Sequence, residues 1–426
     1  MENIDKISQN TLNARSPAIS RLARRLVLAQ LRQLGSGELV IREPGQQEHI
    51  LGDGDQRWPV ARLDVHDHSV WRDLLTGGGV GAAEAFVAGD WSTPDLTALL
   101  RFFTRNVDRM NAFEDRFSWL SKPTLKALHW LNRNTREGSR KNISAHYDLG
   151  NDLFRLFLDP TMMYSSAVYP REDATLDEAA TFKLDLICRK LDLNPGDRVI
   201  EIGTGWGGFA IHAAKHYGCH VTTTTISSEQ LALAREKVAL EGLEERITLL
   251  FDDYRDLEGQ FDKLVSIEMI EAVGPQFLDS YLGQISRLLK PDGLALVQAI
   301  TMPEQRYRRA LRNVDFIQRY IFPGSFIPSF GAILDAMRRK TDLVMTHAED
   351  FGFHYARTLR DWRDRFLSQT EALEGLGYDE AFRRLWQFYF AYCEAGFDER
   401  AIGVNQLLLA RPGNKRPHLM ADPGRV

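Results

Sequence analysis

The sequence is poor in cysteine and has no long apolar run. Its three cysteines are an odd number without the paired spacing of zinc ligands, so we expect no disulfide framework, no metal site and a reducing compartment. No apolar stretch reaches the roughly 18 residues that a membrane-spanning helix needs. The first apolar run is interrupted by arginines, which argues against a signal peptide. We therefore expect a soluble, cytoplasmic protein.

An excess of positive charge is also missing. The 53 basic residues against 58 acidic ones leave a formal net charge of −5, so no overall basic field exists to hold nucleic acid. The hydrophobic fraction of 44% is that of a globular protein and excludes general disorder. A length of 426 residues predicts two domains. We expect a smaller N-terminal α+β domain over residues 1–135, a larger domain over 136–411 and a disordered tail over 412–426.

The larger domain shows the pattern of an α/β protein with a parallel sheet. Short apolar segments alternate with helical periodicity, as in βαβ units. Residues 303–364 are aromatic, basic and irregular, which predicts an inserted cap. The N-terminal domain should contain strands at 38–42 and 60–65 and a glycine-rich turn at 77–81. In the larger domain we predict strands at 198–202, 220–225, 247–251, 263–267 and 294–300, helices at 209–217, 228–241 and 275–289, and a closing hairpin from 343–347 and 404–410.

A second glycine-rich turn follows the first strand of the larger domain. Residues 201–208 read EIGTGWGG, where Gly203, Gly205 and Gly207 allow a tight turn and a close approach to a ligand. A dinucleotide site would instead show G-x-G-x-x-G and an acid about 20 residues later. Here Glu201 precedes the glycines, which favours a ligand with a cationic amino group. S-adenosylmethionine, whose amine and sulfonium are both cationic, has that character; a tight turn without a ligand is the alternative.

Several motifs occur in the order and spacing of one family. They are YSSA from Tyr164, the turn at 201–208, TISSEQ from Thr225, DYRD from Asp253 and RYIFPG from Arg319. With them the sequence resembles the cyclopropane-fatty-acyl-phospholipid synthases, a family that also contains enzymes methylating unsaturated lipid chains. Position 319 is arginine where relatives usually have lysine, which keeps the charge. The resemblance implies a class I methyltransferase fold, with a Rossmann-like, mostly parallel seven-stranded sheet and a helical cap.

The resemblance also implies which residues bind S-adenosylmethionine. Tyr164 and Ser165 would hold the methionyl part, and Gln230 would bind the ribose. Tyr254 and Arg255 would flank the adenine. Ordinary packing is the alternative for the aromatic members of this set, and a solvated helix position is the alternative for Gln230. The remaining predicted cofactor residues are Glu201, Gly203, Gly205, Trp206, Gly207 and Thr225.

The reaction implied by the family needs no nucleophilic side chain, because the carbon–carbon double bond of the lipid is itself the nucleophile. Methyl transfer leaves a carbocation, which aromatic faces can stabilise and which must lose a proton to a base. Aromatic residues of the predicted cap suit the first need, with an ordinary core or a lipid groove as alternatives. They are Tyr307, Phe316, Tyr320, Phe322, Phe326, Phe330, Phe351, Phe353 and Tyr355.

The chain departs from these relatives at the positions that would hold the base. In the cyclopropane-forming relatives a bound bicarbonate is the base, held by a cysteine, a glutamate, a histidine, a tyrosine and the backbone of an isoleucine. Serine and glutamine replace the cysteine and the histidine here, which weakens the case for bicarbonate. The five matching positions are Ser166, Glu271, Gln298, Tyr355 and Ile300.

Glu268 stands where these relatives usually have glycine, three residues before Glu271. If the segment is helical, both carboxylates lie on one face. We hypothesise that the Glu268 carboxylate takes the place of bicarbonate as base or cation stabiliser. Repulsion between two buried acids should raise the pKa of one of them. The alternative is an acid at a strand end that binds the cofactor or a backbone amide.

We therefore expect an S-adenosylmethionine-dependent enzyme that transfers a methyl or methylene group to the cis double bond of phospholipid-linked acyl chains, of the cyclopropane synthase type. An altered bicarbonate site leaves a second outcome open, a methyl- or methylene-branched chain. The aromatic cap argues against a small polar substrate. A non-catalytic lipid-binding protein on the same fold is an alternative of another class, against which the intact glycine-rich turn, Gln230, Glu271 and Tyr355 speak.

A phospholipid substrate implies contact with a membrane surface, so we expect peripheral association with its inner face. Two basic tracts could make this contact. The second covers residues 122–141, for which a docking helix between the domains is the alternative. We expect no nucleic-acid partner, and a homodimer is left open. The first tract, at 18–34, reads as a basic amphipathic helix, with Ile19, Leu22, Leu26 and Leu31 on one face and Arg21, Arg24, Arg25 and Arg32 alongside.

Overall fold

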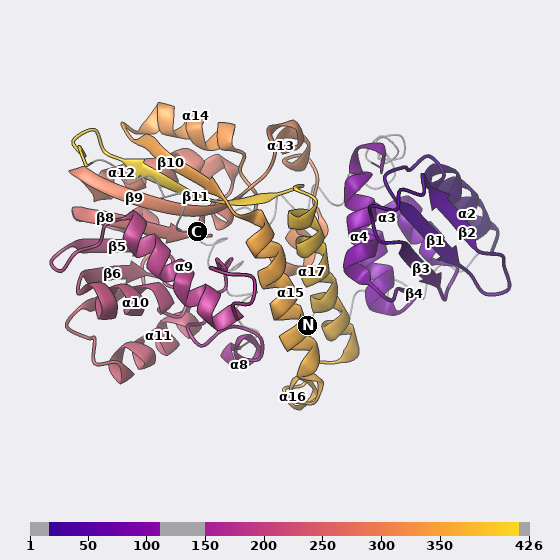
Figure 1. Cartoon of the computed structure of the whole chain (residues 1–426), viewed down its shortest axis with the longest axis horizontal. Coiled ribbons are helices and arrows are strands. Elements are labelled where there is room, and N and C mark those ends of the chain that lie inside the picture. Colours follow the sequence, from indigo (N-terminus) through magenta and orange to yellow (C-terminus); the bar gives the residue numbers. More distant parts are fainter. Residues whose placement is uncertain (1–16, 111–149, 417–426) are drawn as a thin grey trace. The chain divides into compact units, whose positions relative to one another are not determined.

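The chain divides into two units, each assembled from separate stretches of sequence (Figure 1). The computed structural model describes residues 17–110 and 150–416. Unit 1 combines the described residues of Met1–Leu131 with Asn313–Pro323 and Trp362–Ala401. Unit 2 combines those of Asn132–Arg312, Gly324–Asp361 and Ile402–Val426. This division differs from the predicted one at residue 135, because two internal stretches pack with the N-terminal region.

The sheet of unit 2 has seven strands, in the order β10-β11-β9-β8-β5-β6-β7. The strands from β5 to β9 are parallel to one another. The remaining two strands are antiparallel, β11 to β9 and β10 to β11. This topology confirms the predicted α/β fold with a mostly parallel seven-stranded sheet. The strands are β5 (Arg198–Ile202), β6 (His220–Thr224), β7 (Ile247–Leu250), β8 (Phe261–Ile267), β9 (Leu289–Thr301), β10 (Val344–Asp350) and β11 (Gly403–Ala410).

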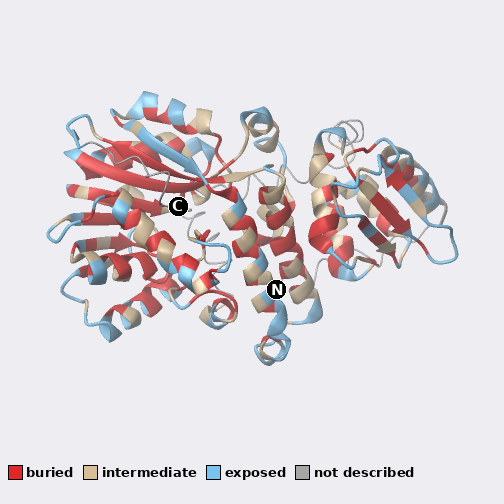
Figure 2. Ribbon diagram, viewed as in Figure 1, coloured by how far each residue is buried: buried red, intermediate tan, exposed pale blue. Residues whose placement is uncertain are grey.

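Helices cover both faces of this sheet (Figure 1). On one face α9 (Leu176–Lys190), α10 (Gly208–Tyr217) and α11 (Ser228–Leu240) form a common core with the strands. On the other face lie α12 (Leu278–Leu288) and α14 (Phe330–Lys340). Figure 2 shows the central strands buried between these layers. Burial from both sides explains why the strands appear in the sequence as nearly continuous apolar runs.

The predicted elements of unit 2 match the observed ones closely, except at the start of β9. The prediction begins this strand at residue 294, whereas the structure begins it at Leu289. Pro291, Asp292 and Gly293 form a strong turn signal. The pairing of β8 with β9 shifts its register at this point, so the strand continues through an irregularity that the sequence pattern marks as a break.

The predicted cap over residues 303–364 is not a single body. Asn313–Pro323 belongs to unit 1, whereas α14 and β10 belong to the layers of unit 2. α15 (Gly352–Ser368) contributes to both units, which divide between Asp361 and Trp362. The other helices of unit 2 are α8 (Asn151–Arg155), η1 (Tyr254–Asp256), η2 (Ile270–Ala272), η3 (Pro275–Phe277) and α13 (Glu304–Ala310).

Unit 1 contains a four-stranded sheet in the order β2-β1-β3-β4. Its α17 packs against α4 and α3. The predicted glycine-rich turn appears as a break inside α3, where Gly78 has a φ of +54°. The elements are β1 (Glu38–Arg42), β2 (His49–Gly52), β3 (Ala61–Val65), β4 (Trp91–Ser92), α2 (Pro17–Leu31), α3 (Val70–Ala88), α4 (Leu96–Arg105), η4 (Ile317–Ile321), α16 (Thr370–Gly375) and α17 (Glu380–Asp398).

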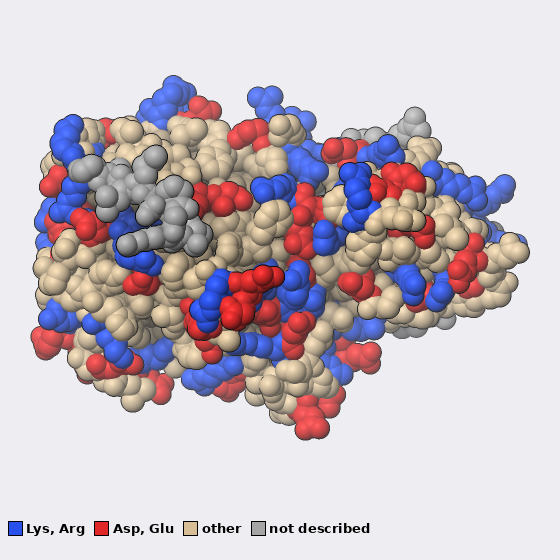
Figure 3. All heavy atoms as spheres, viewed as in Figure 1, with Lys and Arg blue, Asp and Glu red and all other residues tan. Residues whose placement is uncertain are grey.

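The surface of the described residues carries mixed charge. On the face drawn in Figure 3, basic and acidic side chains are interspersed, in line with the nearly balanced composition. Within 17–110 and 150–416, no helix combines the length and the hydropathy needed to cross a membrane.

Candidate active site

The glycine-rich turn joins β5 to α10 at the carboxyl end of the parallel strands. Gly203, Gly205 and Gly207 have φ values of +102°, +52° and +86°, a conformation that other residues rarely adopt. The backbone amides of Gly203 and Thr204 donate to the Thr224 carbonyl, which ties the turn to β6. Ligands of open α/β sheets bind at this edge, so the turn lies where a ligand could approach its backbone.

Glu201 is the buried acid that precedes the turn. It is 2% exposed, and the Thr223 hydroxyl donates to its carboxylate over 2.6 Å. Burial raises the pKa of Glu201 to about 8, and the positive charge of Lys183 only partly offsets this effect. A cationic group bound beside Glu201 would stabilise its ionised form. The Glu201 carboxylate, an acceptor, therefore suits the amine of S-adenosylmethionine.

The two neighbouring strands bring further predicted cofactor residues to the same edge. After β6, the Thr225 hydroxyl donates to Gln230 Oε1 over 2.9 Å, and both residues are buried. This burial argues against the solvated alternative for Gln230. After β7, Asp253 holds the Arg255 guanidinium through contacts of 2.8 and 2.6 Å, with the guanidinium carbon 5.6 Å from the centre of the Tyr254 ring.

Tyr164 and Trp206 form an aromatic wall with Phe154. The Phe154 ring centre lies 5.3 Å from that of Tyr164 and 5.0 Å from that of Trp206. The Trp206 indole is buried, and its N–H donates to Asn151 Oδ1 on α8 over 2.7 Å. The packing explanation therefore accounts for Trp206, whose polar atom is used within the protein.

A second polar cluster surrounds the carboxylate of Glu268, at the end of β8. Its Oε1 accepts hydrogen bonds from the Ser166 backbone N–H over 2.9 Å and from Gln298 Nε2 over 2.7 Å. Its Oε2 accepts one from the Tyr355 hydroxyl over 2.7 Å. Ser166, Gln298 and Tyr355 are three of the five positions matched to the bicarbonate site. The structure therefore brings the Glu268 carboxylate to groups that the family resemblance assigns to an anion.

Ser166 contributes to this cluster in an unexpected way. Its backbone N–H faces Glu268, whereas its hydroxyl donates to the Ala167 carbonyl over 2.9 Å. The serine therefore does not present its side chain to the carboxylate as the replaced cysteine would to an anion. Backbone direction is decided by the loop path, which the residue type alone does not reveal.

The backbone of Glu268 is strained. Its φ of +49° lies in the left-handed region, which costs a residue other than glycine about 1–2 kcal/mol. Its N–H donates to the Gln298 carbonyl over 2.8 Å, which holds the conformation. This chain therefore keeps a carboxylate at a position whose backbone suits glycine. Strain retained in this way is typical of functional sites.

Glu271 follows on η2, a single turn of 3₁₀-helix rather than a longer helix. Its Oε1 accepts a hydrogen bond from the Ile300 backbone N–H over 2.6 Å. Its Oε2 is buried, and within the described ranges no group donates to it. Burial raises the pKa of Glu271 to about 8, and repulsion from Glu268 acts in the same direction.

The two acids differ in the number of donors that they face. Glu268 and Glu271 are each partly exposed as whole residues, but their carboxyl groups are surrounded by protein atoms. Desolvation therefore raises the pKa of each carboxyl. For Glu268, hydrogen bonds from Tyr355, Gln298 and the Ser166 amide oppose this rise. Burial thus acts in the same direction on both acids, and the donors around Glu268 are what favours its ionised form over that of Glu271.

Lys183 is a residue of this region that the sequence reasoning missed. It lies on the buried face of α9, is 0% exposed and donates through Nζ to Ser165 Oγ over 2.8 Å. Burial lowers the pKa of Lys183 to about 8, and the charges of Glu268 and Glu201 partly restore it. A lysine within the apolar stripe of an amphipathic helix was the available signal, since such positions are normally apolar.

The predicted aromatic stripe does not form one cluster. Phe316 belongs to unit 1, where its ring centre lies 4.8 Å from that of Phe388 on α17. Phe326 belongs to the core beneath α12 and α14, and Phe353 is 52% exposed. Among the described residues of the predicted set, Tyr355 is the member whose hydroxyl donates to Glu268. Aromatic character alone does not reveal into which core a side chain folds.

Comparison with known proteins identifies the family. The family model for mycolic acid cyclopropane synthetase matches residues 134–407. The chain is 37% identical over 429 residues to tuberculostearic acid methyltransferase UfaA1 of Mycobacterium tuberculosis, covering 96% of this chain and 95% of that protein. It is 36% identical over 354 residues to the cyclopropane-fatty-acyl-phospholipid synthase of Escherichia coli, covering 82% of this chain and 88% of that one.

Solved structures agree with this assignment. The cyclopropane synthase MmaA2 of Mycobacterium tuberculosis is 30% identical with a TM-score of 0.59, covering 64% of this chain and 98% of that chain. The mycolic acid cyclopropane synthase CmaA1, solved in complex with SAH and CTAB, is 31% identical with a TM-score of 0.59 and the same coverage of both chains. The chain therefore belongs to the mycolic acid cyclopropane synthetase family, a family of S-adenosylmethionine-dependent methyltransferases that act on lipids.

Proposed function

We propose that this protein transfers a methyl group from S-adenosylmethionine to the cis double bond of a phospholipid-linked acyl chain, and that the Glu268 carboxylate takes up the proton that is then lost. The observation that carries this proposal is the Glu268 cluster, in which three donors hold one carboxylate. A carboxylate of the chain itself takes the role that bicarbonate has in relatives with glycine at this position.

S-adenosylmethionine, when bound, supplies an electrophilic methyl group. The residues at the carboxyl ends of β5, β6 and β7 fit it: Glu201 for the amine, Gln230 for the ribose and Tyr254 for the adenine. Lys183 would steady Ser165, which faces the methionyl part in the family resemblance. The glycine turn offers backbone with no side chain in the way.

Glu268 and Glu271 take different protonation states in this proposal. Glu268, with three donors, is the ionised base. Burial raises the pKa of both acids, and Glu271 has one donor to oppose the rise where Glu268 has three, so the proposal leaves the proton on Glu271. A base that accepts a proton from a lipid carbon must be ionised when the cation forms, so the assignment places the charge on Glu268.

The chemistry balances for two products. The electron pair of the double bond forms the new carbon–carbon bond, which leaves a cation on the neighbouring carbon. If the new methyl group then loses a proton to Glu268, its C–H electrons close a cyclopropane ring. If a hydride first shifts to the cation, the same loss forms a methylene branch. Either product adds one CH₂ to the chain and needs no reductant.

We favour the methylene branch. The altered bicarbonate site and the relative UfaA1, a tuberculostearic acid methyltransferase matched over 96% of this chain, support it. Ring closure is the second candidate. The Escherichia coli relative and the retained Glu271, Tyr355 and Ile300 favour that outcome.

Lipid analysis tests this function directly. The protein is produced in a bacterial host that lacks its own lipid-methylating enzymes, and the fatty acids are examined by mass spectrometry. We expect unsaturated chains that gain one CH₂, with fragmentation at a branch. Fragmentation typical of a ring would select the second candidate, and unmodified chains with a folded protein would contradict both.

Substitution of Glu268 tests its role. Glu268→Gln keeps the size of the side chain but removes the base, so turnover should fall about 10²–10⁴-fold with unchanged cofactor affinity. Glu268→Gly restores the residue of the relatives, and added bicarbonate or acetate should recover part of its activity. Full activity of Glu268→Gln, or a requirement of the unaltered enzyme for bicarbonate, would contradict the proposed base.

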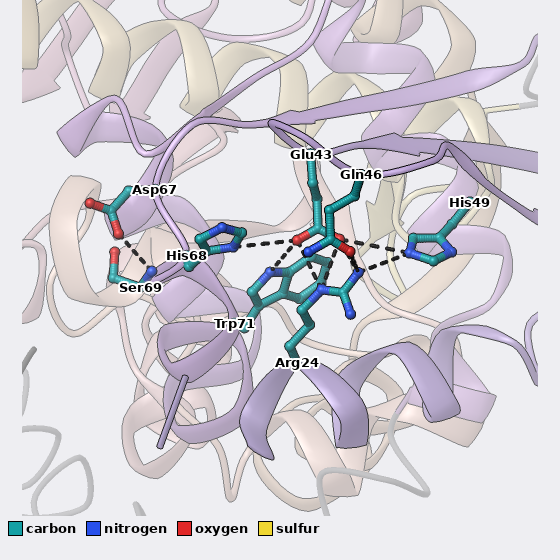
Figure 4. A network of polar contacts seen from close by, with 8 residues as sticks. All are labelled: Arg24, Glu43, Gln46, His49, Asp67, His68, Ser69 and Trp71. Atoms are coloured by element: carbon teal, nitrogen blue, oxygen red, sulfur yellow. Dashed lines mark hydrogen bonds and ion pairs between the residues drawn. The ribbon is translucent and has the colours of Figure 1, made fainter. Parts of the chain in front are cut away.

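We also propose that unit 1 docks on an anionic membrane surface through α2. Leu22 on α2 and Ile50 on β2 are 59% and 66% exposed, and Arg25 on α2 and Arg32, the residue after α2, are exposed. Two residues of the predicted helix face do not lie free on the surface as predicted. Leu31 is buried in the core of unit 1, and Arg24 is engaged within the unit (Figure 4). The second predicted tract, 122–141, lies outside the described residues.

A further inference from the structure

A row of polar side chains crosses the sheet beside Glu268. In the pairing of β9 with β11, Gln298 lies opposite Gln406, and in the pairing of β11 with β10, Gln406 lies opposite Glu349. Directly paired residues point to the same face of a sheet. Lys190, the last residue of α9, covers this face and contacts both Gln406 and Glu349.

The hydrogen bonds along this row have one direction. Lys190 Nζ donates to Gln406 Oε1 over 2.7 Å, Gln406 Nε2 donates to Gln298 Oε1 over 3.0 Å, and Gln298 Nε2 donates to Glu268 Oε1 over 2.7 Å. An ammonium group can only donate and an ionised carboxylate can only accept. Each amide between these two ends must therefore turn its oxygen toward Lys190 and its NH₂ group toward Glu268.

The row is closed to water at its centre. Gln298 is 0% and Gln406 is 1% exposed, so neither amide can replace a lost partner with solvent. Lys190 keeps 15% of its side chain exposed and is held by the Glu349 carboxylate. An amide that turned over would direct its oxygen at the Glu268 carboxylate, which is unfavourable where charge is poorly screened.

We infer that Gln406 and Lys190 are positioning residues for the proposed base, because they fix the Gln298 amide with its NH₂ group toward Glu268. The inference rests on the proposed function of Glu268. Neither residue belongs to the set matched to the bicarbonate site or to the cofactor. They act one and two hydrogen bonds behind Gln298, on β11 and α9.

The test uses matched substitutions in the full chain. Gln406→Met removes the donor to Gln298 without changing charge. Gln284→Met is the control, because Gln284 is also a buried amide of unit 2, donating to the Leu257 carbonyl over 2.8 Å, but lies outside the row. Turnover, the KM for S-adenosylmethionine and the pH dependence of kcat are measured on vesicles that contain unsaturated phospholipid.

We expect Gln406→Met to lower kcat about tenfold with an unchanged KM, because the hydrogen bond from Gln298 to the Glu268 carboxylate is weakened when its supporting hydrogen bond is lost. The acidic limb of the kcat profile should move to higher pH, because the Gln298 amide that favours the ionised form of Glu268 is no longer held with its NH₂ group toward the carboxylate. Glu271, Lys183 and Tyr355 also face Glu268, and Gln406→Met alters the contacts of none of them. Gln284→Met should leave kcat and the limb in place.

Lys190 provides an independent variant that tolerates change because it is partly exposed. Lys190→Arg keeps a donor-only cation and should retain kcat. Lys190→Met removes the cation and should lower kcat as Gln406→Met does. An unchanged kcat and pH profile in Gln406→Met, or equal losses in Lys190→Arg and Lys190→Met, would overturn the inference. If Glu268→Gln itself keeps full turnover, the proposed base is wrong, and the row then has no catalytic group to orient.

Discussion

At the scale of single residues, the site depends on acids whose surroundings set their charge. Glu201 and Glu271 each have a pKa raised to about 8 by burial. Glu268 faces three donors at a backbone position that suits glycine. Burial raises the pKa of Glu268 too, so the three acids differ in their donors and in neighbouring charge, on which the proposed division between binding and proton transfer rests.

Glu201 predicts that cofactor binding releases a proton. Its carboxyl is mostly protonated at neutral pH in the free protein because burial raises its pKa to about 8, and a bound ammonium group would favour the ionised form. Affinity should therefore increase as the pH rises from 6 to 8. Calorimetry in buffers of different ionisation enthalpy measures the proton directly.

The matched variant for this measurement is Glu201→Gln. It should bind the cofactor more weakly and lose the released proton and its share of the pH dependence. Lys183, whose pKa burial lowers to about 8, titrates in the same range and contacts Ser165. A proton release of the same size in Glu201→Gln would assign the proton to Lys183 or another group instead.

At the scale of elements, Glu43 joins helix and sheet within unit 1 (Figure 4). It follows β1, and its side chain is 0% exposed. Arg24 of α2 reaches Glu43 Oε1 over 2.6 Å, and the Trp71 indole of α3 donates to Glu43 Oε2 over 3.1 Å. Burial opposes ionisation, but the hydrogen bonds and charge of Arg24 outweigh it and lower the pKa of Glu43. One carboxylate thereby fixes three elements.

This junction predicts a stability loss in Glu43→Gln. The free energy of unfolding should fall by about 2–3 kcal/mol, because the hydrogen bonds to a charged group are lost. The ion pair of Glu43 with Arg24 stabilises the fold fully at pH values above 4.5, the ordinary pKa of glutamate. This contribution is lost as the pH falls toward the lower pKa that Glu43 has in the folded state. Urea unfolding at pH 7 and pH 4 measures both effects.

The control for this junction is Glu48→Gln. Glu48 pairs with Arg42 on the surface, with side chains about half exposed, so its loss should change the free energy of unfolding by less than about 1 kcal/mol. Equal losses in the two variants would show that burial of the Glu43 carboxylate adds nothing to its pairing.

At the scale of the whole molecule, the residues proposed for membrane contact and those proposed for the chemistry belong to different units. The Glu268 and Glu201 sites lie in unit 2, while the exposed apolar residues of α2 and β2 lie in unit 1. Binding to a surface and turnover on a dispersed lipid should therefore respond to different substitutions.

The proposed docking face predicts weaker vesicle binding in Arg25→Glu/Arg32→Glu. Sedimentation with anionic vesicles should show the loss most clearly at low salt, because salt screens headgroup attraction. Lys215→Glu/Arg235→Glu changes the net charge equally on α10 and α11 of unit 2 and should bind as the unaltered protein does. If both pairs of substitutions weaken binding alike, overall charge rather than α2 governs attachment.

Much of unit 2 can be predicted from local sequence. The parallel strands follow from short apolar runs, and the turn from the positions of Gly203, Gly205 and Gly207, because both depend on neighbours in the chain. Glu268 stands out against a family pattern of glycine. Each of these features is contained in a short stretch of neighbouring residues, so periodicity and spacing suffice to find it.

The sequence by itself determined the sheet, the glycine turn and the unusual pair of acids. Only the tertiary structure decided which segments join unit 1, that Lys183 enters the polar region from a helix face, and that Gln406 and Lys190 stand behind Gln298. Local periodicity fixes which way a residue points along its own element. Which residue meets it from a distant strand depends on register and packing across the whole sheet, and one sequence carries no direct record of that pairing.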